Sequence, residues 1–576
     1  MSPGAGRLRA LAPRGIFEPR TLLIGGAVLL IAYLALVPLI YLITGTFLDE
    51  DGFTLQFVRD AYGKHGLGEM ALNSLRFAAG STMLAVALGT VLAYLIVRTD
   101  VPFKRLMFAV SLVPLVIPGV LHTIAWIFLL SPRAGALNSL FEPLLGGPLF
   151  DIFSLGGMIL VQGLHLVPLV FLLMAAAFRS MDPALEEAAL MSGARLGTVF
   201  RRITLPAIAP ALFAAILVMA VRSLEAFEVP ALLGIPDGTW VFTSRIWRAL
   251  GTYPRDFGAA GAYSMPLILM TTVGVYLHSR FSRRGRAFQT LTGRGPRPRA
   301  LELGRWRRPA AALIIAYFFV ALVLPLLMLL YGSTQPFFRS PSIEGLSSMS
   351  LQNYRTVLGQ DETIRAFRNS LLLGIGSATA VMLLMGVASW FVVRTKAAGR
   401  WMVDNLAFLP LSVPSLILGV ALLFVYLRVP LPIYGTLWIL FIAYLTAYMP
   451  YGMRYASASM HQVGSELEES AQVSGATWWK TLRRVILPLL MPGLLAGWIY
   501  ILVSSVRELS TSILIYSPGR EVLGVRIFEL WQSGKPTELA ALGVVLVTAM
   551  VPLVVVAYRL GSRIGLREPG RARLRS

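Results

Sequence analysis

Long apolar stretches alternate with short polar ones along nearly the whole chain. A helix needs about 20 consecutive apolar residues to cross a hydrocarbon layer of roughly 30 Å. By this criterion the sequence predicts an all-α integral membrane protein with about twelve transmembrane helices. The predicted spans are residues 21–47, 72–97, 106–130, 155–178, 207–234, 259–278, 310–332, 370–393, 403–427, 435–453, 489–516 and 539–560.

The overall composition agrees with this interpretation. The chain of 576 residues is 56% hydrophobic and only 14% charged, with a mean hydropathy of +0.70, which lies well outside the range of soluble domains. The first apolar run is too long for a signal-peptide core and is not followed by a small-residue cleavage site, so we expect it to remain as the first span. With no cysteine in the chain, disulfides and thiolate metal sites are excluded.

Charge distribution sets the expected orientation. The formal net charge is +22, and with a cytosolic N-terminus the predicted cytosolic segments hold 34 of the 51 Lys and Arg residues. This asymmetry is the positive-inside rule, and it places both termini in the cytosol. No basic segment has the interleaved aromatics of a nucleic-acid module, so the lipid bilayer rather than nucleic acid is the expected surroundings.

The chain contains two copies of one six-helix unit. The tripeptide NSL at 73–75 recurs at 369–371, VRT at 97–99 recurs at 393–395, and a later set of matches shares a smaller offset. Because six is even, both copies enter the membrane in the same direction, which makes the repeat parallel. The expected organisation is a cytosolic N-terminal segment (1–20), a first six-helix unit (21–279), a basic linker (280–309), a second six-helix unit (310–560) and a basic cytosolic tail (561–576).

The most polar repeat lies between the fourth and fifth spans of each unit, in loops expected to face the cytosol. EEAALMSGARLGTVFRRITLP at 186–206 is echoed by EESAQVSGATWWKTLRRVILP at 468–488. Asp182 as N-cap and Glu186 near the helix dipole favour a short helix, which the following Gly193 should end. The pattern predicts a short helix, a tight turn, and a second helix that continues into the next span.

These loops resemble a known family signature. Glu187 and two alanines, then Gly193 and a Leu-Pro pair at fixed spacing, are similar to the EAA loop of permease subunits of ATP-binding-cassette importers; Ser470 and Val485 are the departures in the second copy. The resemblance covers about residues 20–565 and extends to the fused iron(III)-type permeases. It implies ATPase-coupling roles for Glu186, Glu187, Ala188, Ala189, Gly193, Ile203, Leu205, Pro206, Glu468, Glu469, Ala471, Gly475, Val485, Leu487 and Pro488.

The same resemblance implies partners and a location. Two copies of an ATPase subunit would dock, one on each loop, an external substrate-binding protein would deliver cargo, and the chain would lie in a bacterial inner membrane. Apolar residues such as Leu190, Met191, Val199 and Val473 would anchor the loops in the ATPase. The alternative is a loop helix that lies on the membrane surface and is anchored by arginines.

Hydrolysis of ATP is not expected in this chain. No G-x-x-x-x-G-K-[ST] phosphate loop occurs, since the nearest match at Gly534 and Lys535 has Glu529 and Pro536 at the positions that require Gly and Ser or Thr. The chain is therefore expected to be a transport subunit and not an enzyme, without a cofactor or metal of its own. ATP and Mg would be used by the partner ATPase.

Ionisable residues within spans are costly and are therefore candidates for the translocation pathway. Carboxylates near the external mouth would suit a hard cation such as ferric iron, or a positively charged organic solute. The simpler interpretation is that an Arg and a Glu three positions apart neutralise each other. The candidates are Arg222, Glu225 and Glu228 in the fifth span and Arg507 and Glu508 in the eleventh.

Two further features of the spans are interpreted structurally. His122 and His165 have no counterpart in the second unit, and a lone membrane histidine more often joins two helices by a hydrogen bond than binds a ligand. Repeated prolines are expected to kink the third and ninth spans. They are Pro114, Pro118, Pro410 and Pro414.

The sequence thus predicts the fused membrane subunit of an ATP-driven importer in which ATPase closure moves both loops as levers. Ferric iron is the expected cargo, with thiamine, a polyamine or a phosphonate as alternatives. A major-facilitator-type transporter would carry its signature between spans two and three, where this chain has only RTDVPFK. A membrane enzyme would need clustered His, Asp or Glu residues, and the five histidines are scattered.

Overall fold

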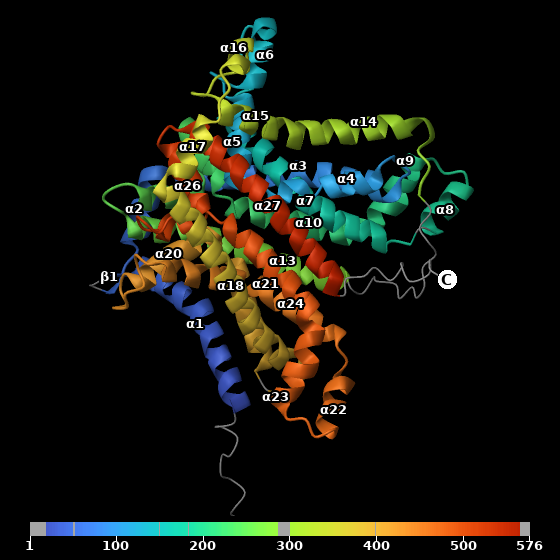
Figure 1. Ribbon diagram of the computed structural model, residues 1–576, viewed down its shortest axis with the longest axis vertical. Coiled ribbons are helices and arrows are strands. Elements are labelled where there is room, and N and C mark those ends of the chain that lie inside the picture. Colours follow the sequence, from blue (N-terminus) through green and yellow to red (C-terminus); the bar gives the residue numbers. More distant parts are fainter. Residues whose placement is uncertain are drawn as a thin grey trace, which may run out of the picture.

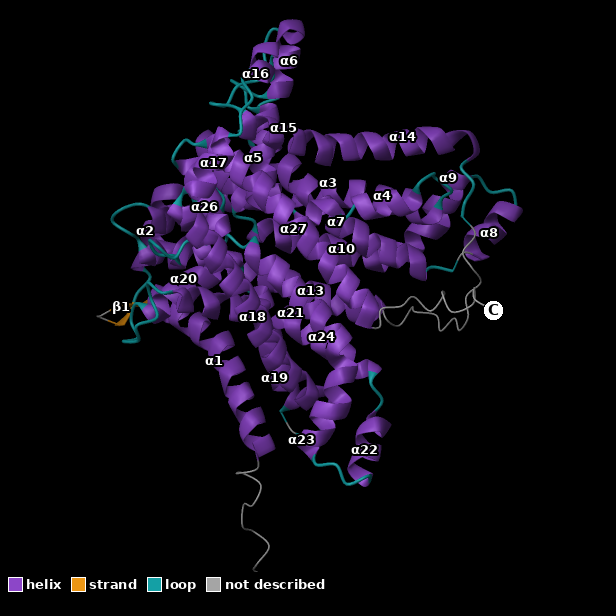
Figure 2. Ribbon diagram, viewed as in Figure 1, coloured by secondary structure: helices purple, strands orange, loops and turns teal. Residues whose placement is uncertain are grey.

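The computed structural model describes residues 19–49, 52–148, 150–182, 184–285, 300–397 and 399–564. Almost every described element is a helix, and the exception is a short hairpin of β1 (Leu48–Asp49) and β2 (Gly52–Phe53) (Figure 2). The predicted all-α fold class is confirmed. Most of the N-terminal segment, the linker from 286 to 299 and most of the tail lie outside the described residues.

The first unit runs from α1 to α13 (Figure 1). Its elements are α1 (Pro19–Phe47), α2 (Gln56–His65), α3 (Leu67–Arg98), α4 (Lys104–Val110), the 3₁₀ turn η1 (Val113–Val116), α5 (Gly119–Leu130), α6 (Ala136–Leu145), α7 (Leu155–Ser180), α8 (Ala184–Met191), α9 (Leu196–Val199), the π-helix η2 (Phe200–Thr204), α10 (Leu205–Glu225), the π-helix η3 (Pro230–Gly234), α11 (Ile235–Asp237), α12 (Phe242–Gly251) and α13 (Phe257–Gly285).

The second unit repeats this order from α14 to α27, after a short 3₁₀ turn η5 (Gly304–Trp306). Its elements are α14 (Arg307–Phe318), the π-helix η6 (Phe319–Val323), α15 (Leu324–Thr334), α16 (Ile343–Ser347), α17 (Gln352–Gly359), α18 (Asp361–Arg394), α19 (Arg400–Phe408), the 3₁₀ turn η7 (Leu409–Ser412), α20 (Ser415–Tyr426), α21 (Leu437–Gln462), α22 (Ser465–Val473), α23 (Trp478–Thr481), the π-helix η8 (Leu482–Ile486), α24 (Leu487–Val506), α25 (Ser512–Ile515), α26 (Leu523–Gln532) and α27 (Pro536–Ile564).

The number of spans supported by length and composition is smaller than predicted. Among the described residues eight helices are long and apolar enough to cross a membrane, or ten if each of two bent pairs counts as one span. All twelve predicted runs fall on helices, but α21 and α27, the tenth and twelfth, are not among those ten. The structure thus has helices at all twelve predicted positions, but only eight to ten of the described helices are long and apolar enough to count as spans.

Four predicted spans are interrupted. The third bends by 100° between Val116 and Gly119, and the ninth bends by 106° between Ser412 and Ser415. Prolines stand at both breaks, where they cannot continue a helical hydrogen-bond ladder, so the predicted kinks are nearly right angles. The fifth and eleventh spans also end earlier than expected, because α10 stops at Glu225 and α24 stops at Val506.

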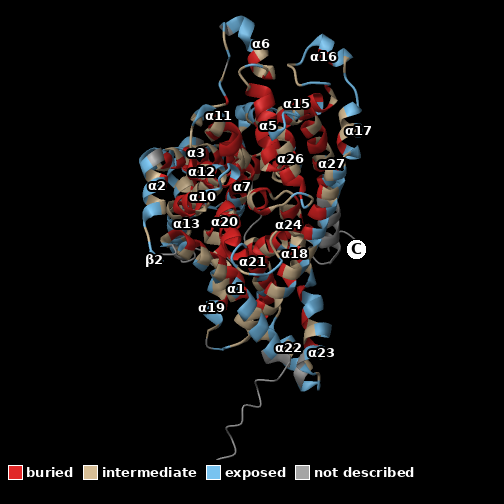
Figure 3. Ribbon diagram, turned by 90° about the vertical axis from the view of Figure 1, so that its left-hand side faces the viewer, coloured by how far each residue is buried: buried red, intermediate tan, exposed pale blue. Residues whose placement is uncertain are grey.

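The two units exchange their first helices. Helix α1 packs on α19 and α20 of the second unit, while α15 packs on α5 of the first. The hydroxyls of Tyr33 in α1 and Tyr426 in α20 lie 3.0 Å apart. One apolar core runs through both units, and the buried residues gather along the middle of the molecule (Figure 3). The chain therefore folds as a single intertwined body.

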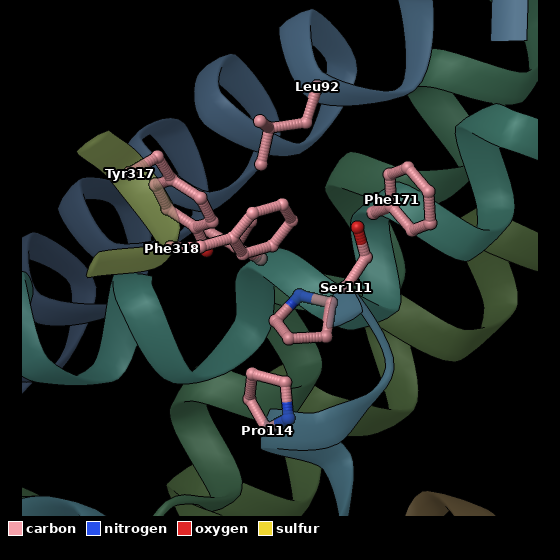
Figure 4. A pocket seen from close by; sticks show the side chains of 8 residues that line it. Leu92, Ser111, Pro114, Phe171, Tyr317 and Phe318 are labelled. Atoms are coloured by element: carbon pink, nitrogen blue, oxygen red, sulfur yellow. The ribbon is translucent and has the colours of Figure 1, made fainter. Parts of the chain in front are cut away.

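A small space lies beside the bend of the third span. It is lined by residues of α3, α7, α14 and the bend, among them Leu92, Pro114 and Tyr317 (Figure 4). Its empty volume is about 180 Å³, divided so that no water molecule fits inside it. We therefore regard it as loose packing around the proline break and not as a ligand site.

Candidate coupling loops and interunit charge cluster

Each of the two repeated loops folds as predicted from its sequence. Helix α8 is followed by a turn at Gly193 (φ 82°), the short α9 and η2, and then α10; helix α22 is followed by Gly475 (φ 79°), α23, η8 and α24. Both glycines adopt the left-handed conformation that L side chains rarely accept. At the start of α8 the Ala184 N–H donates to the Asp182 carboxylate at 2.9 Å, as expected for a capping residue.

Each short helix is closed by a backbone hydrogen bond to the carbonyl of an alanine of the motif. The Ala194 N–H donates to the Ala189 carbonyl at 3.1 Å, and the Ala476 N–H donates to the Ala471 carbonyl at 3.0 Å. This closing bond across a left-handed glycine is the Schellman arrangement. It explains why the glycine follows the alanines at a fixed distance.

The remaining motif positions form the entry to the next span. Ile203 lies in η2 and Val485 in η8, and each π-helix leads directly into a helix that begins with a Leu-Pro pair. Helical backbone continues from Gly197 to Glu225 and from Trp479 to Val506, so each proline stands inside a continuous helix, where it removes one N–H donor. The pairs are Leu205 with Pro206 and Leu487 with Pro488.

The loops present apolar side chains outward. Met191 and Val473, which occupy matched positions, are each 90% exposed, and Glu187 and Glu469 are exposed as well. Docking of a partner on these side chains stays a prediction. Val199 was also expected to anchor the loop in the ATPase, but its side chain is 1% exposed and packs inside the chain. The prediction that Val199 is an anchor is therefore wrong.

The first glutamate of the repeated loop, Glu186, points into the protein. Glu186 is fully buried and forms an ion pair with Arg98 at the end of α3. Its other carboxylate oxygen accepts a hydrogen bond from the Thr204 hydroxyl at 2.5 Å. Glu186 stands in the first turn of α8, as expected for a carboxylate near the positive end of the helix dipole.

The second unit repeats this ion pair in a looser form. Glu468 lies 3.7 Å from Nε of Arg394 at the end of α18, and both side chains are 13% exposed. Arg98 and Arg394 are the arginines of the two VRT tripeptides. The repeat of the tripeptide alone does not predict a role for these arginines, but a charge that recurs at the end of an apolar span is a signal for one.

The charged residues of the fifth and eleventh spans gather where the units meet. Arg222 lies 3.8 Å from Glu225 and donates a hydrogen bond to the Tyr451 hydroxyl of the second unit. Arg507 donates to the Leu115 carbonyl of the first unit. The Arg222–Glu225 pairing is therefore present, while contact of these groups with cargo stays a prediction.

The other two carboxylates have distinct surroundings. Glu508 caps α25, because it accepts hydrogen bonds from the Thr511 N–H at 2.6 Å and the Ser512 hydroxyl at 2.5 Å. Glu228 lies beyond the end of α10 and accepts a hydrogen bond from Ser510 at 3.4 Å. Glu228 and Ser510 are separated by 282 positions, the offset of the repeat, so they meet at the axis that relates the two units.

A row of tyrosines next to Arg222 was not anticipated. Tyr448, Tyr451 and Tyr455 share one face of α21, and Tyr500 of α24 lies with its ring centre 5.2 Å from that of Tyr451. Their spacing of three and four residues is visible in the sequence. The matched positions of the first unit hold Leu166, Leu169, Leu173 and Val218, so this aromatic wall belongs to one unit.

The two histidines lie together. The rings of His122 in α5 and His165 in α7 are 5.2 Å apart. The two histidines therefore meet between α5 and α7, while a hydrogen bond from either of them to the facing helix stays a prediction. Across the described part of the chain, no group of three or more His, Asp or Glu residues is placed to hold a metal ion.

Two intertwined units with repeated loops are the structure expected of a duplicated membrane transport component. Comparison with known proteins gives the same class of protein. The family model for the binding-protein-dependent transport system inner membrane component matches residues 85–286 and again 373–567. The chain belongs to this family and is a fused permease, with two copies of the family module in one polypeptide.

Several relatives span most of the chain. The putative ferric transport system permease protein FbpB 1 of Haemophilus influenzae is 24% identical over 493 residues, 84% of this chain and 75% of that protein. The ferric transport system permease protein FbpB of Actinobacillus pleuropneumoniae is 22% identical over 92% of this chain and 76% of its own length.

Other relatives match a single unit. The putative 2-aminoethylphosphonate transport system permease protein PhnV of Salmonella typhimurium is 31% identical over 244 residues, 40% of this chain and 91% of that protein. A solved bacterial ABC transporter involved in the import of alginate is 20% identical, with a TM-score of 0.36 over 45% of this chain and 97% of the solved chain.

Proposed function

We propose that this chain is the membrane-spanning subunit of an ATP-driven importer that translocates ferric iron delivered by an external binding protein. The observation that carries the cargo is the similarity to ferric permeases over 84% and 92% of the chain. Family membership supports the dependence on a binding protein, which is part of the family's description. The chain itself performs no covalent chemistry in this proposal.

In this proposal ATP hydrolysis acts on the chain through the two repeated loops. We propose that α8 and α22 each dock on one copy of an ATPase subunit, which holds ATP and Mg²⁺ and hydrolyses the nucleotide. The exposed Met191 and Val473 support this role, since each is an apolar side chain that a pocket would desolvate. The left-handed Gly193 and Gly475 let the backbone turn away directly after the docking helix.

The orientation follows from the charge pattern. We propose a bacterial inner membrane with both termini and both coupling loops in the cytosol, and permease units at 21–279 and 310–560. The excess of Lys and Arg in alternate loops supports this orientation, and the name of the family supports the membrane.

Transport would use the interface between the units. Arg222 with Tyr451 and Arg507 with the Leu115 carbonyl bridge the units in opposite directions. If closure of the ATPases rotates one unit against the other, these bridges must break. We therefore place the pathway at this interface, where the carboxylates of Glu225 and Glu228 would suit a hard cation.

A phosphonate is the second candidate cargo. The 31% identity to PhnV exceeds the identity to the ferric permeases, and the arginines Arg222 and Arg507 would suit an anion. That similarity covers 40% of the chain, a single unit, whereas the ferric permeases match both units. Ferric iron is therefore the preferred assignment.

The test is transport by the complete system in liposomes. The chain would be reconstituted with its ATPase and binding protein, and ATP-dependent uptake of ferric iron compared with that of thiamine, putrescine and 2-aminoethylphosphonate. We expect iron uptake that requires ATP. Uptake of another solute would keep the importer and replace the cargo, while uptake driven by an ion gradient without the ATPase would contradict the proposal.

A further inference from the structure

We propose that Arg98 and Arg394 are positioning residues that lock the two coupling helices to the ends of the long helices α3 and α18. This inference rests on the proposed function, because it assumes that the ATPases push on α8 and α22. Each arginine ends a membrane helix and pairs with the first glutamate of the adjacent loop. We name these pairs the first lock (Arg98–Glu186) and the second lock (Arg394–Glu468).

The first lock joins three segments. Arg98 is 4% exposed and Glu186 is fully buried, so the ion pair has no access to water. The hydroxyl of Thr204, which precedes α10, donates to the same carboxylate. Glu186 of α8 is therefore tied at once to the end of the second span and to the start of the fifth.

The second lock is built differently. Arg394 pairs with Glu468 at 3.7 Å and also donates to the backbone carbonyls of Met460, at 3.3 Å, and Val463. The position that matches Thr204 is Ile486, which has no hydroxyl to offer. The second lock thus holds α22 against α18 and the end of α21, and it lacks a side-chain link to α24.

The end of the interunit linker reinforces the first lock. The Leu301 N–H donates to the Arg98 carbonyl at 2.8 Å, the Asp100 N–H donates to the Leu301 carbonyl at 3.1 Å, and the Leu303 N–H donates to the Asp100 carboxylate at 2.9 Å. No comparable strand pairing occurs at 395–397 among the residues that the structure describes. The linker therefore holds the segment that carries Arg98 in place by hydrogen bonds.

A lever transmits force only if it is fixed to the part it must move. Helix α8 has 8 residues and ends in a glycine turn, so a push on it could be lost in bending at Gly193. An ion pair away from water is strong and costly to separate. The first lock would make α8 move together with α3 and α10, which converts docking into motion of the spans.

The experiment compares paired substitutions. Arg98→Met with Glu186→Gln removes both charges, leaves no unpaired buried ion, and keeps an acceptor for Thr204. We expect this variant to assemble with the ATPase and hydrolyse ATP, while the cargo imported per ATP falls about five-fold, the lower end of ordinary coupling between sites. Arg394→Met with Glu468→Gln should produce a smaller fall.

A matched control lies at the other end of α18. Arg365 and Glu362 form a half-exposed pair at 3.8 Å, and Glu362 also lies 3.9 Å from Arg526; Arg365→Met with Glu362→Gln should leave the cargo imported per ATP unchanged. Arg98→Lys, which keeps the charge, should recover part of the loss. If transport and hydrolysis fall in proportion in the first-lock variant, or the ratio stays at the wild-type value, the lock is refuted.

Two other outcomes can be told apart from a refutation of the lock. If the first-lock variant does not assemble, the second-lock variant and Arg98→Lys decide, and unchanged ratios in both would overturn the inference. If the wild-type complex shows no ATP-driven import at all, the proposed function fails and not the lock alone.

Discussion

Removing the glutamate of each lock should destabilise the two units by different amounts. In the Glu186→Ala variant the Arg98 guanidinium loses its ionic partner in a place closed to water, and Thr204 loses its acceptor. Loss of one partner of a buried ion pair typically costs about 3–5 kcal/mol. We expect a decrease of that size in the free energy of unfolding.

The matched substitution in the second unit should cost less. After Glu468→Ala the Arg394 guanidinium still donates to the Met460 and Val463 carbonyls, and it is partly accessible to water. Pairs with solvent access contribute about 0–1 kcal/mol, so we expect a loss of about 1 kcal/mol. The two variants should therefore differ by roughly 2–4 kcal/mol, which follows from the two ranges.

The assay is unfolding of the purified chain in mixed micelles with increasing SDS, followed by tryptophan fluorescence. Single variants are compared with Glu187→Ala, which removes an exposed carboxylate of the same helix and should leave the midpoint unchanged. Equal losses for Glu186→Ala and Glu468→Ala, or a larger loss for Glu468→Ala, would refute the reasoning from burial.

Three other predictions concern docking and transport. Gly193→Asp with Gly475→Asp forces two side chains into left-handed backbone and should abolish co-purification of the ATPase; an intact complex would contradict docking at these loops. Met191→Ala with Val473→Ala should weaken ATPase binding by about 1–3 kcal/mol, as truncation of interface anchors does, measured by titration of labelled ATPase; an unchanged affinity would leave these side chains outside the interface. Glu225→Gln should slow iron uptake while ATPase assembly persists, and uptake at the wild-type rate would reduce Glu225 to a structural partner of Arg222.

Much of the fold could be predicted because it depends on local pattern. Apolar runs gave the helices, and the echo at offset 282 gave the duplication and the helix–turn–helix form of the loops. Pro118 and Pro414 marked the breaks in the third and ninth spans, although their near right angles depend on what packs around them. The predicted ends of the fifth and eleventh spans lie beyond the ends of α10 and α24, since apolar residues resume after the charged ones, at 231–234 and 513–515.

The contacts of the site could not be predicted in the same way, because they join distant segments. Arg98 and Glu186 are 88 positions apart, and Arg222 and Tyr451 are 229 apart. Periodicity reports which face of a helix is apolar and says nothing of which helix it meets. Val199 shows the limit, since an apolar residue in a polar loop can anchor to a partner or pack inward, and here it packs inward.

Fusion of the two units allows them to differ where identical subunits could not. Tyr451, in the row formed with Tyr448 and Tyr455, accepts a hydrogen bond from Arg222 of the other unit, while the equivalent face of α7 carries leucines. The locks differ too, because the linker reaches the first and not the second among the described residues. A linker between the units exists only in a fused chain. Because the first lock is the more buried, the first unit would transmit ATPase motion more rigidly. The second unit would supply most of the polar aromatic surface between the units.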